Sequence, residues 1–478
     1  MSSELITNSQ SKKTGEQTSF IEYPVKGPDS NSVILSATAG SGKTFSAVER
    51  LKFMLANGVD PSKIIFFSFT VAAVEELKKR VANDQIKITT IHSFCTHLLG
   101  KMKKMRKIVT FYDFIDWFKE FHKPKSGSPQ KDIQQFYYDV EKLYDTAEYL
   151  SSEISAFKLQ TADNIKCKVP DYIKQYQDFQ RRTKSIDFSD MLILVRESLK
   201  EDKWLRMFRN QYDYIFVDEY QDTSSIQMQI LLSLNAKYYY LMGDRSQSIY
   251  GYSGANCDAI EAMLKRRRQT VEMHLSTNFR SAKSIVENSN RHSSLKAIPF
   301  HQEEGKVHRK IILFEHLVEI LKNNPYVVVL VRTNSVIREL EKRLISLKVP
   351  MRYENYLKKS EIDDILKAKE RVSTRNKMRE LLPYFGTADA VIEFIKLNID
   401  KQSHIKTIHK SKGLEFPVCV VVNSIAPDIL QENNLSIPKE YLSLISYDPD
   451  NIEDQESKNV HYVAISRAIN ELYFMIME

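Results

Sequence analysis

Short runs of apolar residues alternate along the chain with longer segments in which apolar residues recur every three or four positions. The runs predict buried strands, and the spaced residues predict helices between them. Strands are expected at 32–37, 64–68, 86–90, 214–217, 238–242, 310–314, 326–331, 418–422 and 472–476. Helices are expected at 45–56 and 72–82. Because strands and helices alternate, the pattern predicts an α/β fold with parallel sheets that helices cover on both faces.

The pattern changes between residues 93 and 185, where helical spacing replaces the strand runs. The stretches FYDFIDWFKEF (111–121) and IQQFYYDVEKLYDTAEYL (133–150) have this spacing, and a loop with two prolines, 123–129, lies between them. This region is interpreted as a helical insertion in the α/β fold. Residues 1–20 are polar, and we expect a mobile arm there.

The composition is that of a globular chain with a modest basic excess. Among 478 residues, 69 Lys and Arg stand against 61 Asp and Glu, and the resulting charge of +8 is compatible with a polyanionic partner. The four cysteines (Cys95, Cys167, Cys257 and Cys419) form no CxxC pair. This argues against a zinc site or a disulfide framework and for a reducing compartment. There is no apolar run of ~18 residues and no signal-peptide core, so we expect a cytoplasmic or other intracellular protein without a membrane span.

The first predicted strand leads into the sequence ATAGSGKT (37–44), and a predicted helix follows. This order of a strand, a glycine loop, Lys-Thr and a helix is the pattern of a phosphate-binding P-loop. One position departs from it, because Ala37 stands where the strict pattern has glycine. Backbone N–H groups in such a loop surround a polyphosphate, Lys43 binds the β- and γ-phosphates, and the Thr44 hydroxyl binds Mg²⁺. The residues expected around the nucleotide are Ala39, Gly40, Ser41, Gly42, Lys43 and Thr44.

Two adjacent carboxylates, Asp218 and Glu219, end the apolar run at 214–217. Ligands of α/β sheets bind at the carboxyl ends of strands, so these side chains are expected near the P-loop. In a nucleoside triphosphatase, Asp218 would hold Mg²⁺, directly or through water. Glu219 would orient and deprotonate the attacking water.

A third polar stretch, GDRSQSIYGYSGA (243–255), follows the run at 238–242. Gln247 could donate a hydrogen bond to a γ-phosphate without adding charge. Tyr250 and Tyr252 could stack on unpaired bases, an interaction worth ~1–3 kcal/mol per base.

These stretches follow one another in the order of the motifs of a known family. The chain resembles the UvrD/PcrA/Rep-like branch of superfamily 1 helicases, and ATAGSGKTF is also similar to the AddA/RecB-like members. The matching segments are ATAGSGKT (37–44), FSFTVAAVEELKKRV (67–81), ITTIHSFC (88–95), IDFSDMLIL (186–194), VDEYQDTS (217–224), GDRSQSIYGYSGA (243–255), LSTNFRS (275–281), VVVLVRTNSVIRELEKRL (327–344), IKTIHKSKGLEF (405–416) and VHYVAISRA (460–468).

The resemblance implies two RecA-like P-loop domains with ATP between them. Domain 1A would comprise 21–95 and 186–274, and a helical insertion, 1B, would occupy 96–185. Domain 2A would comprise 275–478. The family carries a large helical subdomain, 2B, before its fifth motif, but too few residues lie there in this chain, so we expect only a reduced 2B region near 363–404.

For ATP, the resemblance adds residues outside the P-loop. Gln247 would sense the γ-phosphate, and Arg280 and Arg467 would act on it as arginine fingers from the second domain. Glu415 would bind the ribose. Phe45 and Phe279 would enclose the adenine, and Gln17 is the candidate adenine-reading glutamine, although its spacing to the P-loop is longer than in the family.

For single-stranded DNA, the resemblance implies contacts from seven residues. They are Thr70, Thr90, His92, Tyr250, Tyr252, Thr407 and His409. Hydroxyls and imidazoles suit phosphate contacts that do not depend on sequence. Two motifs depart from the family: Val71 and Ala72 replace Asn-Lys after Thr70, and Ser253 replaces the arginine after Tyr252.

The leading hypothesis is an ATP- and Mg²⁺-dependent helicase or translocase that moves 3′→5′ on single-stranded DNA and at junctions with duplex. The alternative is an ATPase or DNA-sensing subunit of a phage-defence (Gabija-like) or replication complex, with a separate nuclease or replication factor as partner. A third reading, a non-enzymatic remnant, is opposed by the presence of Lys43, Asp218, Glu219, Arg280 and Arg467.

Overall fold

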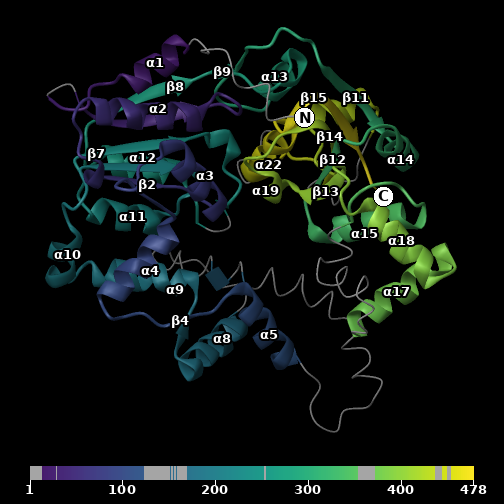
Figure 1. Cartoon of the computed structure of the whole chain (residues 1–478), viewed down its shortest axis with the longest axis horizontal. Helices are drawn as coiled ribbons and strands as arrows, with labels where there is room; N and C mark the ends of the chain where they lie inside the picture. Colours follow the sequence, from purple (N-terminus) through teal and green to yellow (C-terminus); the bar gives the residue numbers. More distant parts are fainter. Residues whose placement is uncertain are drawn as a thin grey trace. The chain divides into compact units, whose positions relative to one another are not determined.

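The computed structural model describes residues 13–27, 30–122, 151, 154–155, 158, 170–251, 254–353, 372–435, 444–448 and 454–477. The chain divides into two compact units (Figure 1). Unit 1 is Met1–Thr277 and unit 2 is Asn278–Glu478.

Unit 1 is built on a six-stranded sheet with the order β3-β2-β6-β7-β1-β8. All neighbouring strands are parallel. The strands are β1 (Ser32–Ala37), β2 (Ile64–Phe67), β3 (Lys87–Thr89), β6 (Tyr214–Asp218), β7 (Tyr238–Gly243) and β8 (Thr270–Leu275). Since every strand runs the same way, the turns that follow β1, β2, β3, β6 and β7 meet at one edge of the sheet.

The helices of unit 1 connect these strands. They are α1 (Gly15–Ile21), α2 (Lys43–Ala56), α3 (Val71–Val81), α4 (Ile91–Lys101), α5 (Phe111–His122), α8 (Pro170–Thr183), α9 (Phe188–Ser198), α10 (Asp202–Phe208), α11 (Ser225–Ser233) and α12 (Cys257–Lys265). Short 3₁₀ turns occur at η1 (Pro61–Lys63), η2 (Tyr220–Asp222) and η3 (Arg245–Gln247), and β4 (Lys107–Ile108) pairs with β5 (Ser185–Ile186) at the base of the helical insertion.

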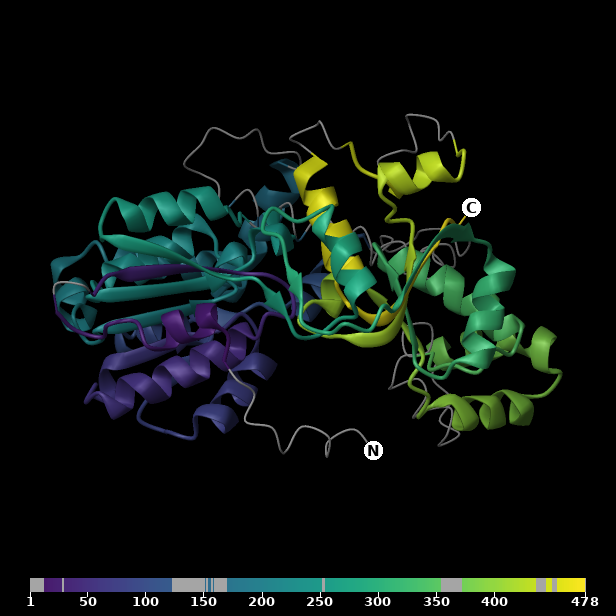
Figure 2. The same cartoon turned by 90° about the horizontal axis from the view of Figure 1, so that it is seen from above.

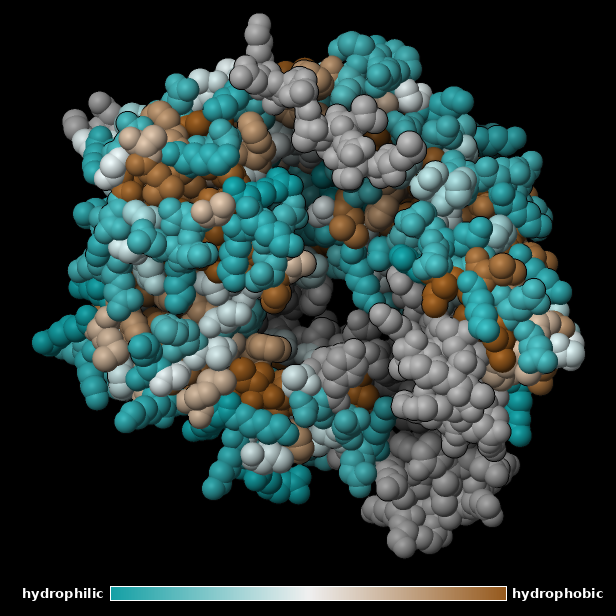
Figure 3. Space-filling view, in the orientation of Figure 1, coloured by the Kyte–Doolittle hydropathy of each residue, from teal (hydrophilic) through white to brown (hydrophobic). Residues whose placement is uncertain are grey.

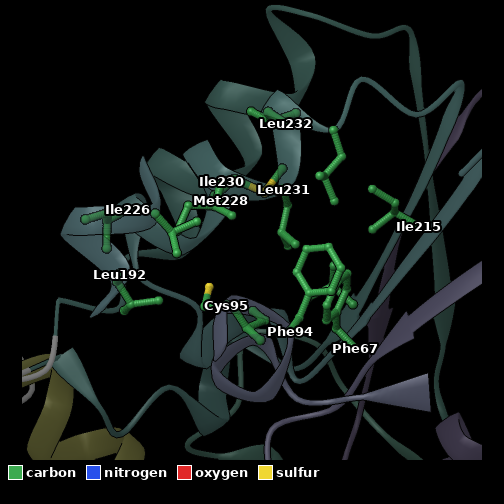
Figure 4. Packing of buried hydrophobic residues seen from close by; sticks show 14 of the residues in the cluster. Phe67, Phe94, Cys95, Leu192, Ile215, Ile226, Met228, Ile230, Leu231 and Leu232 are labelled. Atoms are coloured by element: carbon green, nitrogen blue, oxygen red, sulfur yellow. The ribbon is translucent and has the colours of Figure 1, made fainter. Parts of the chain in front are cut away.

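Alternate residues of each strand in unit 1 face opposite sides of the sheet. Val33 and Leu35 pack with α1, α2 and α3, whereas Ile34 packs with α4, α9 and α11. Figure 2 shows this layering, with the purple helices below the sheet and teal helices above it. The core on the Ile34 side of the sheet includes Phe67, Phe94 and residues of α11 (Figure 4). Strands buried on both faces explain why the sequence shows continuous apolar runs.

Unit 2 contains a five-stranded parallel sheet with the order β11-β15-β14-β12-β13. Its strands are β11 (Lys306–Ile312), β12 (Val327–Val331), β13 (His404–Thr407), β14 (Phe416–Val422) and β15 (Ala468–Met475). The strands β9 (Thr277–Asn278) and β10 (Ile298–Pro299) form a separate two-stranded sheet, and the division of the chain into units falls within β9. The helices are α13 (Lys283–Asn290), α14 (Phe314–Asn323), α15 (Asn334–Ser346), α17 (Val372–Phe385), α18 (Ala388–Asn398), α19 (Ile408–Ser411), α20 (Pro427–Glu432) and α22 (Gln455–Ile465).

The α/β fold with parallel sheets is confirmed, and several local predictions need correction. Residues 15–20 of the expected mobile arm belong to α1, in which Gln17, Phe20 and Ile21 are buried. The predicted strand at 310–314 runs instead from Lys306 to Ile312, and α14 begins at Phe314. Strands β8 and β13 were not predicted, because their sequences, TVEMHL and HIKT, mix polar with apolar residues.

Two predicted regions are only partly described. Of the insertion at 96–185, the structure describes 96–122, 151, 154–155, 158 and 170–185, which include α5 and α8. The stretch at 133–150 and the loop at 123–129 lie outside the described residues. Of the region near 363–404, residues 372–404 are described, and α17 and α18 pack there against the core of unit 2 through Leu381, Val391 and Ile395.

Hydrophilic residues dominate the face of the molecule in Figure 3, with apolar residues gathered in smaller areas. Within the described ranges, no helix combines the length and apolar character needed to cross a lipid bilayer.

Candidate functional site

The P-loop connects β1 to α2 in unit 1. Gly40 (φ 70°) and Gly42 (φ 77°) adopt the left-handed backbone conformation, which glycine enters without steric cost. The loop is fixed at its start, where the Thr38 amide donates to the carbonyl of Leu275 at 3.0 Å. Gly42 provides no side-chain cap for α2. The first amides of α2 therefore have no side-chain acceptor from the cap residue, which suits an anionic ligand.

Lys43 lies between the two predicted carboxylates. Its Nζ is 3.0 Å from Asp218 Oδ1 and 2.5 Å from Glu219 Oε1. Burial disfavours the charged ammonium, but the two carboxylates outweigh it and raise the pKa of Lys43 above its usual value. Burial also raises the pKa of Asp218, and Lys43 opposes that shift. The site thus contains one largely buried cation and two carboxylates within contact distance.

These residues fit a magnesium-bound triphosphate. Thr44 lies in the first turn of α2, next to Lys43, and Asp218 ends β6 with its side chain largely buried. The carboxylates already attract a cation, the lysine ammonium, and carboxylate and hydroxyl oxygens are ligands that Mg²⁺ accepts. Across the described part of the chain, no group of three or more His, Cys, Asp or Glu residues could hold a metal. Two protein ligands suit Mg²⁺, which keeps waters and phosphate oxygens as further ligands.

Gln247 lies in η3, directly after β7, and is buried. Its Nε2 donates to Asp244 Oδ2 at 2.8 Å, while the other oxygen of Asp244 accepts the Ser246 amide at 2.9 Å. Burial raises the pKa of Asp244, and the hydrogen bond from Gln247 opposes the shift. Since β7 lies between β1 and β6, Gln247 belongs to the same edge of the sheet as the P-loop and Asp218.

Gln17 reaches the P-loop from α1. Its Nε2 donates to the carbonyl of Ser41 at 3.4 Å, and its backbone and side chain form a capping box with Thr14. The neighbouring Glu16 accepts hydrogen bonds from the amide of Ser276 at 2.7 Å and from its hydroxyl at 2.8 Å. The unusual spacing of Gln17 in the sequence therefore does not prevent its side chain from reaching the loop.

In unit 2, the structure brings Arg280, Glu415 and Arg467 into one cluster. Arg280 Nε lies 2.6 Å from Glu415 Oε2, and Arg280 Nη1 donates to the carbonyl of Ser466 at 3.4 Å. Arg467 is buried, with Nη1 donating to the carbonyl of Leu414 at 3.2 Å. Its Nε donates to the carbonyl of Val463 at 3.0 Å. Of the two arginines, Arg280 has the more accessible side chain.

The two predicted adenine-binding rings lie in different units. Phe45 occupies the first turn of α2 and is 36% exposed, as expected of a ring that is not part of the core. Phe279 follows β9 and packs against Phe300, with their ring centroids 4.9 Å apart. Phe300 is itself 57% exposed.

The three threonines predicted to bind DNA share a structural role. Thr70, Thr90 and Thr407 are the N-caps of α3, α4 and α19, where each hydroxyl accepts a backbone amide of its helix. Thr70 is exposed, whereas Thr90 and Thr407 are buried. His409 is half-buried in α19. Helix capping thus accounts for the threonine hydroxyls, and only Thr70 is freely accessible.

The predicted aromatic contacts come with two partners that sequence reasoning missed. Tyr250 packs against Phe69, which is 43% exposed, with ring centroids 5.1 Å apart. His92 packs edge-on against Phe188, which is 47% exposed, and burial lowers the pKa of His92. Phe69 follows β2, and Phe188 begins α9. Tyr252 lies outside the described residues.

Comparisons with known proteins agree with this geometry. A model of the UvrD/REP helicase N-terminal domain matches residues 20–268, and one of the UvrD-like helicase C-terminal domain matches 366–478. The chain belongs to the UvrD/REP helicase family. The first match covers five strands of the sheet in unit 1 and ends before β8. The second covers β13, β14 and β15 and includes Glu415 and Arg467.

Several individual proteins are similar to the chain. A probable DNA helicase II homolog of Mycoplasma capricolum is 26% identical over 412 residues, covering 77% of this chain and 57% of the relative. The ATP-dependent DNA helicase PcrA of Staphylococcus aureus is 28% identical over 276 residues, covering 54% and 37%. A probable DNA helicase II homolog of Mycoplasma pneumoniae is 27% identical over 281 residues, covering 53% and 38%. The matches thus span between about a third and just over half of each relative's length.

Proposed function

We propose that the chain hydrolyses ATP and uses the energy to move along single-stranded DNA and separate strands. The observation that carries this proposal is the contact of the P-loop Lys43 with Asp218 and Glu219. The named relatives, a helicase PcrA and helicase II homologs, support DNA as the partner. The 3′→5′ direction is proposed from the family resemblance.

In the proposed reaction, unit 1 binds the nucleotide. Loop amides and Lys43 bind the phosphates, and Gln17 and Phe45 bind the adenine. Thr44 and Asp218 would hold Mg²⁺, which supplies charge neutralisation at the phosphates. Glu219 accepts a proton from the attacking water, and Gln247 donates to the γ-phosphate.

Unit 2 contributes the remaining proposed contacts. We assign Glu415 to the ribose, Phe279 to the adenine, and Arg280 and Arg467 to the charge that develops on the γ-phosphoryl group. Since Arg280 is now paired with Glu415, their ion pair must break before both can act. For DNA, we propose phosphate contacts from Thr70, Thr90, His92, Thr407 and His409, and base stacking by Tyr250 and Tyr252 with Phe69 and Phe188 as additional rings.

The proposal is tested by ATP hydrolysis with and without single-stranded DNA. We expect DNA to stimulate hydrolysis and Lys43→Ala to abolish it. Lys52→Ala is the matched control, because Lys52 lies on the same helix in an exposed ion pair with Glu49. A wild-type protein without DNA-stimulated hydrolysis, or a Lys43→Ala protein that retains it, would contradict the proposal.

A second candidate function is an ATPase subunit that unwinds poorly alone and acts with a nuclease or replication factor in a phage-defence or replication complex. It is favoured by the small size of the region before β13, where the described residues form only α17 and α18. Strand displacement on duplexes with a 3′ or a 5′ tail separates the candidates. Robust unwinding from the 3′ tail favours the motor, hydrolysis without unwinding favours the subunit, and unwinding only from the 5′ tail refutes the proposed direction.

A further inference from the structure

The side-chain amide of Gln221 bridges the ends of two neighbouring strands in unit 1. Gln221 lies in η2 and is fully buried. Its Nε2 donates to Glu219 Oε2 at 2.5 Å, and its Oε1 accepts the backbone amide of Asp244 at 3.2 Å. Glu219 follows β6, and Asp244 follows β7. One amide group therefore joins the candidate base to the loop that carries Gln247.

The backbone of Gln221 is held by the same loop. Its carbonyl accepts the hydroxyl of Ser248 at 3.1 Å. Gly243 leaves room for the side chain, because a Cβ there would lie 2.1 Å from Gln221 Oε1 and 2.8 Å from the ring of Tyr220. The bridge thus depends on a residue without a side chain at the end of β7.

Glu219 has an uncommon backbone conformation, and the hydrogen bond from Gln221 helps to hold its side chain in place. Its φ of 52° and ψ of 43° are left-handed, a conformation that is strained for a residue with a Cβ. One carboxylate oxygen, Oε1, contacts Lys43, and the other, Oε2, contacts Gln221. If Lys43 moves to the phosphates when a nucleotide binds, Oε1 loses its contact with Lys43 and Gln221 still holds Oε2.

We propose that Gln221 is a positioning residue for ATP hydrolysis, which holds Glu219 so that Oε1 faces the attacking water. This inference rests on the proposed function. In the step concerned, the water oxygen bonds to the γ-phosphorus, and the bond from the γ-phosphorus to the β–γ bridging oxygen breaks. The water proton goes to Glu219, and ADP and phosphate form. A neutral amide fixes the carboxylate without cancelling the charge that attracts the proton.

The chemistry of the amide predicts which kinetic constant changes. Gln221 contacts no part of the P-loop in the hydrogen bonds described above, so nucleotide affinity does not depend on it. Orientation of the base acts only in the chemical step, so its loss lowers kcat and leaves ground-state binding intact.

The test is Gln221→Met, which keeps an unbranched side chain of similar length and removes both hydrogen-bonding groups. We expect kcat for DNA-stimulated hydrolysis to fall about 10- to 100-fold, while the affinity for a fluorescent ATP analogue, measured by direct titration, changes less than about threefold. Gln227→Met is the matched control. Gln227 is also a buried glutamine, but it caps α11 by accepting the Ser224 amide at 2.8 Å, so its loss should lower thermal stability and leave kcat unchanged.

A double-mutant cycle separates positioning from a general effect on the fold. In a Glu219→Gln background, Gln221→Met should cause no further decrease in single-turnover hydrolysis, because the base that it positions is already absent. A purely structural role would give the same additional loss in both backgrounds, and that result would overturn the inference.

Gly243→Ala tests the bridge from the other strand and serves if Gln221→Met fails to fold. It should lower kcat with little change in nucleotide affinity, because the added Cβ occupies the position of the amide. An unchanged kcat in the folded Gln221→Met or Gly243→Ala protein refutes the role of Gln221. Failure of the wild-type protein to hydrolyse ATP instead refutes the proposed function.

Discussion

In unit 1 the candidate residues follow the carboxyl ends of β1, β6 and β7, whereas in unit 2 Glu415 and Arg467 directly precede β14 and β15. Both units are parallel sheets covered by helices, yet these candidate ATP residues lie at opposite ends of the strands in the two units. In unit 1, the turns present backbone amides and a helix N-terminus together with Lys43, an arrangement that suits phosphates. In unit 2, the cluster consists of guanidinium groups held by backbone carbonyls and one carboxylate.

This difference indicates that unit 1 mainly binds the nucleotide and that unit 2 acts mainly during hydrolysis. A site made of amides, a lysine and two carboxylates can bind a nucleotide by itself, while a pair of arginines stabilises charge that appears only during the reaction. Changes to the phosphate-binding residues of unit 1, such as Lys43, should therefore affect binding and hydrolysis together. Changes in unit 2 should affect hydrolysis with less effect on binding.

The largest effect is expected for Lys43→Ala. Removing the ammonium leaves Asp218 and Glu219 in mutual repulsion and removes the phosphate contact. We expect kcat to fall at least ~10³-fold, with weaker binding of a fluorescent ATP analogue measured by titration. Normal binding in this variant would argue against unit 1 as the main binding surface.

Arg280→Ala should have the next largest effect. Arginine fingers contribute about 10³–10⁵ in kcat in other phosphoryl-transfer enzymes, and we expect a loss of at least about 10²-fold with little change in nucleotide affinity. Arg291→Ala is the control, because Arg291 is an exposed arginine that pairs with Asp428 in the same unit. Arg467→Ala should in addition lower thermal stability, since carbonyls of Val463 and Leu414 lose their donor. A strong loss of binding in Arg280→Ala would remove the contrast between the units.

Loss of either ring of the Phe69–Tyr250 pair in unit 1 should affect DNA binding more than ATP hydrolysis. We expect Phe69→Ala and Tyr250→Ala each to weaken single-stranded DNA binding by about 5- to 150-fold, the range for one stacked base. ATP hydrolysis measured without DNA should not change. Tyr326→Ala is the control, because Tyr326 is 55% exposed and precedes β12, at the end of that strand opposite the one that pairs with Thr407. Fluorescence anisotropy of a labelled oligonucleotide would measure the affinity.

A further prediction concerns stability and distinguishes the cores of the units. In unit 2, His292 and His461 are buried with ring centroids 4.7 Å apart. Burial lowers the pKa of His292 to about 3 and that of His461 to about 4, and Asp428 opposes both shifts. The unfolded histidines bind protons below their ordinary pKa of about 6.5 and the folded ones do not, so stability is lost as the pH falls from about 6.5 toward 4.

Each of these histidines should remove about 1.4 kcal/mol per pH unit in that window. Proteolysis at decreasing pH should therefore cleave unit 2 before unit 1. His461→Gln should make the pH dependence shallower, whereas replacement of the exposed His316 by glutamine should not. Equal acid sensitivity of His461→Gln and wild type would contradict this account.

The parts that the sequence predicted best are those in which a local pattern determines the structure. The P-loop and Asp218 follow apolar runs, and such runs form central strands. The sequence did not predict α1, because only Phe20 and Ile21 of its seven residues are large and apolar and their burial depends on the rest of unit 1. Phe69 was missed for the opposite reason, since it continues the apolar run FFSF although its ring lies outside the core.

Contacts between distant segments were also beyond prediction. No spacing in the sequence indicates that the amide of Gln221 meets Asp244, or that Arg467 is buried against carbonyls of its own unit. The predicted boundaries of 1B and 2B stay predictions, because much of 1B and residues 363–371 of the 2B region lie outside the described residues. Tyr252 stays a prediction for the same reason.

The helix α1 is bound at two points, through Gln17 to the P-loop and through Glu16 to Ser276, where the chain approaches unit 2. If the nucleotide contacts Gln17, it binds only the docked form of this helix. Thermodynamic reciprocity then requires that docking and nucleotide binding favour one another by the same factor. A tenfold gain in affinity corresponds to about 1.4 kcal/mol of added docking stability, so amide hydrogen exchange in α1 should slow when the nucleotide is present.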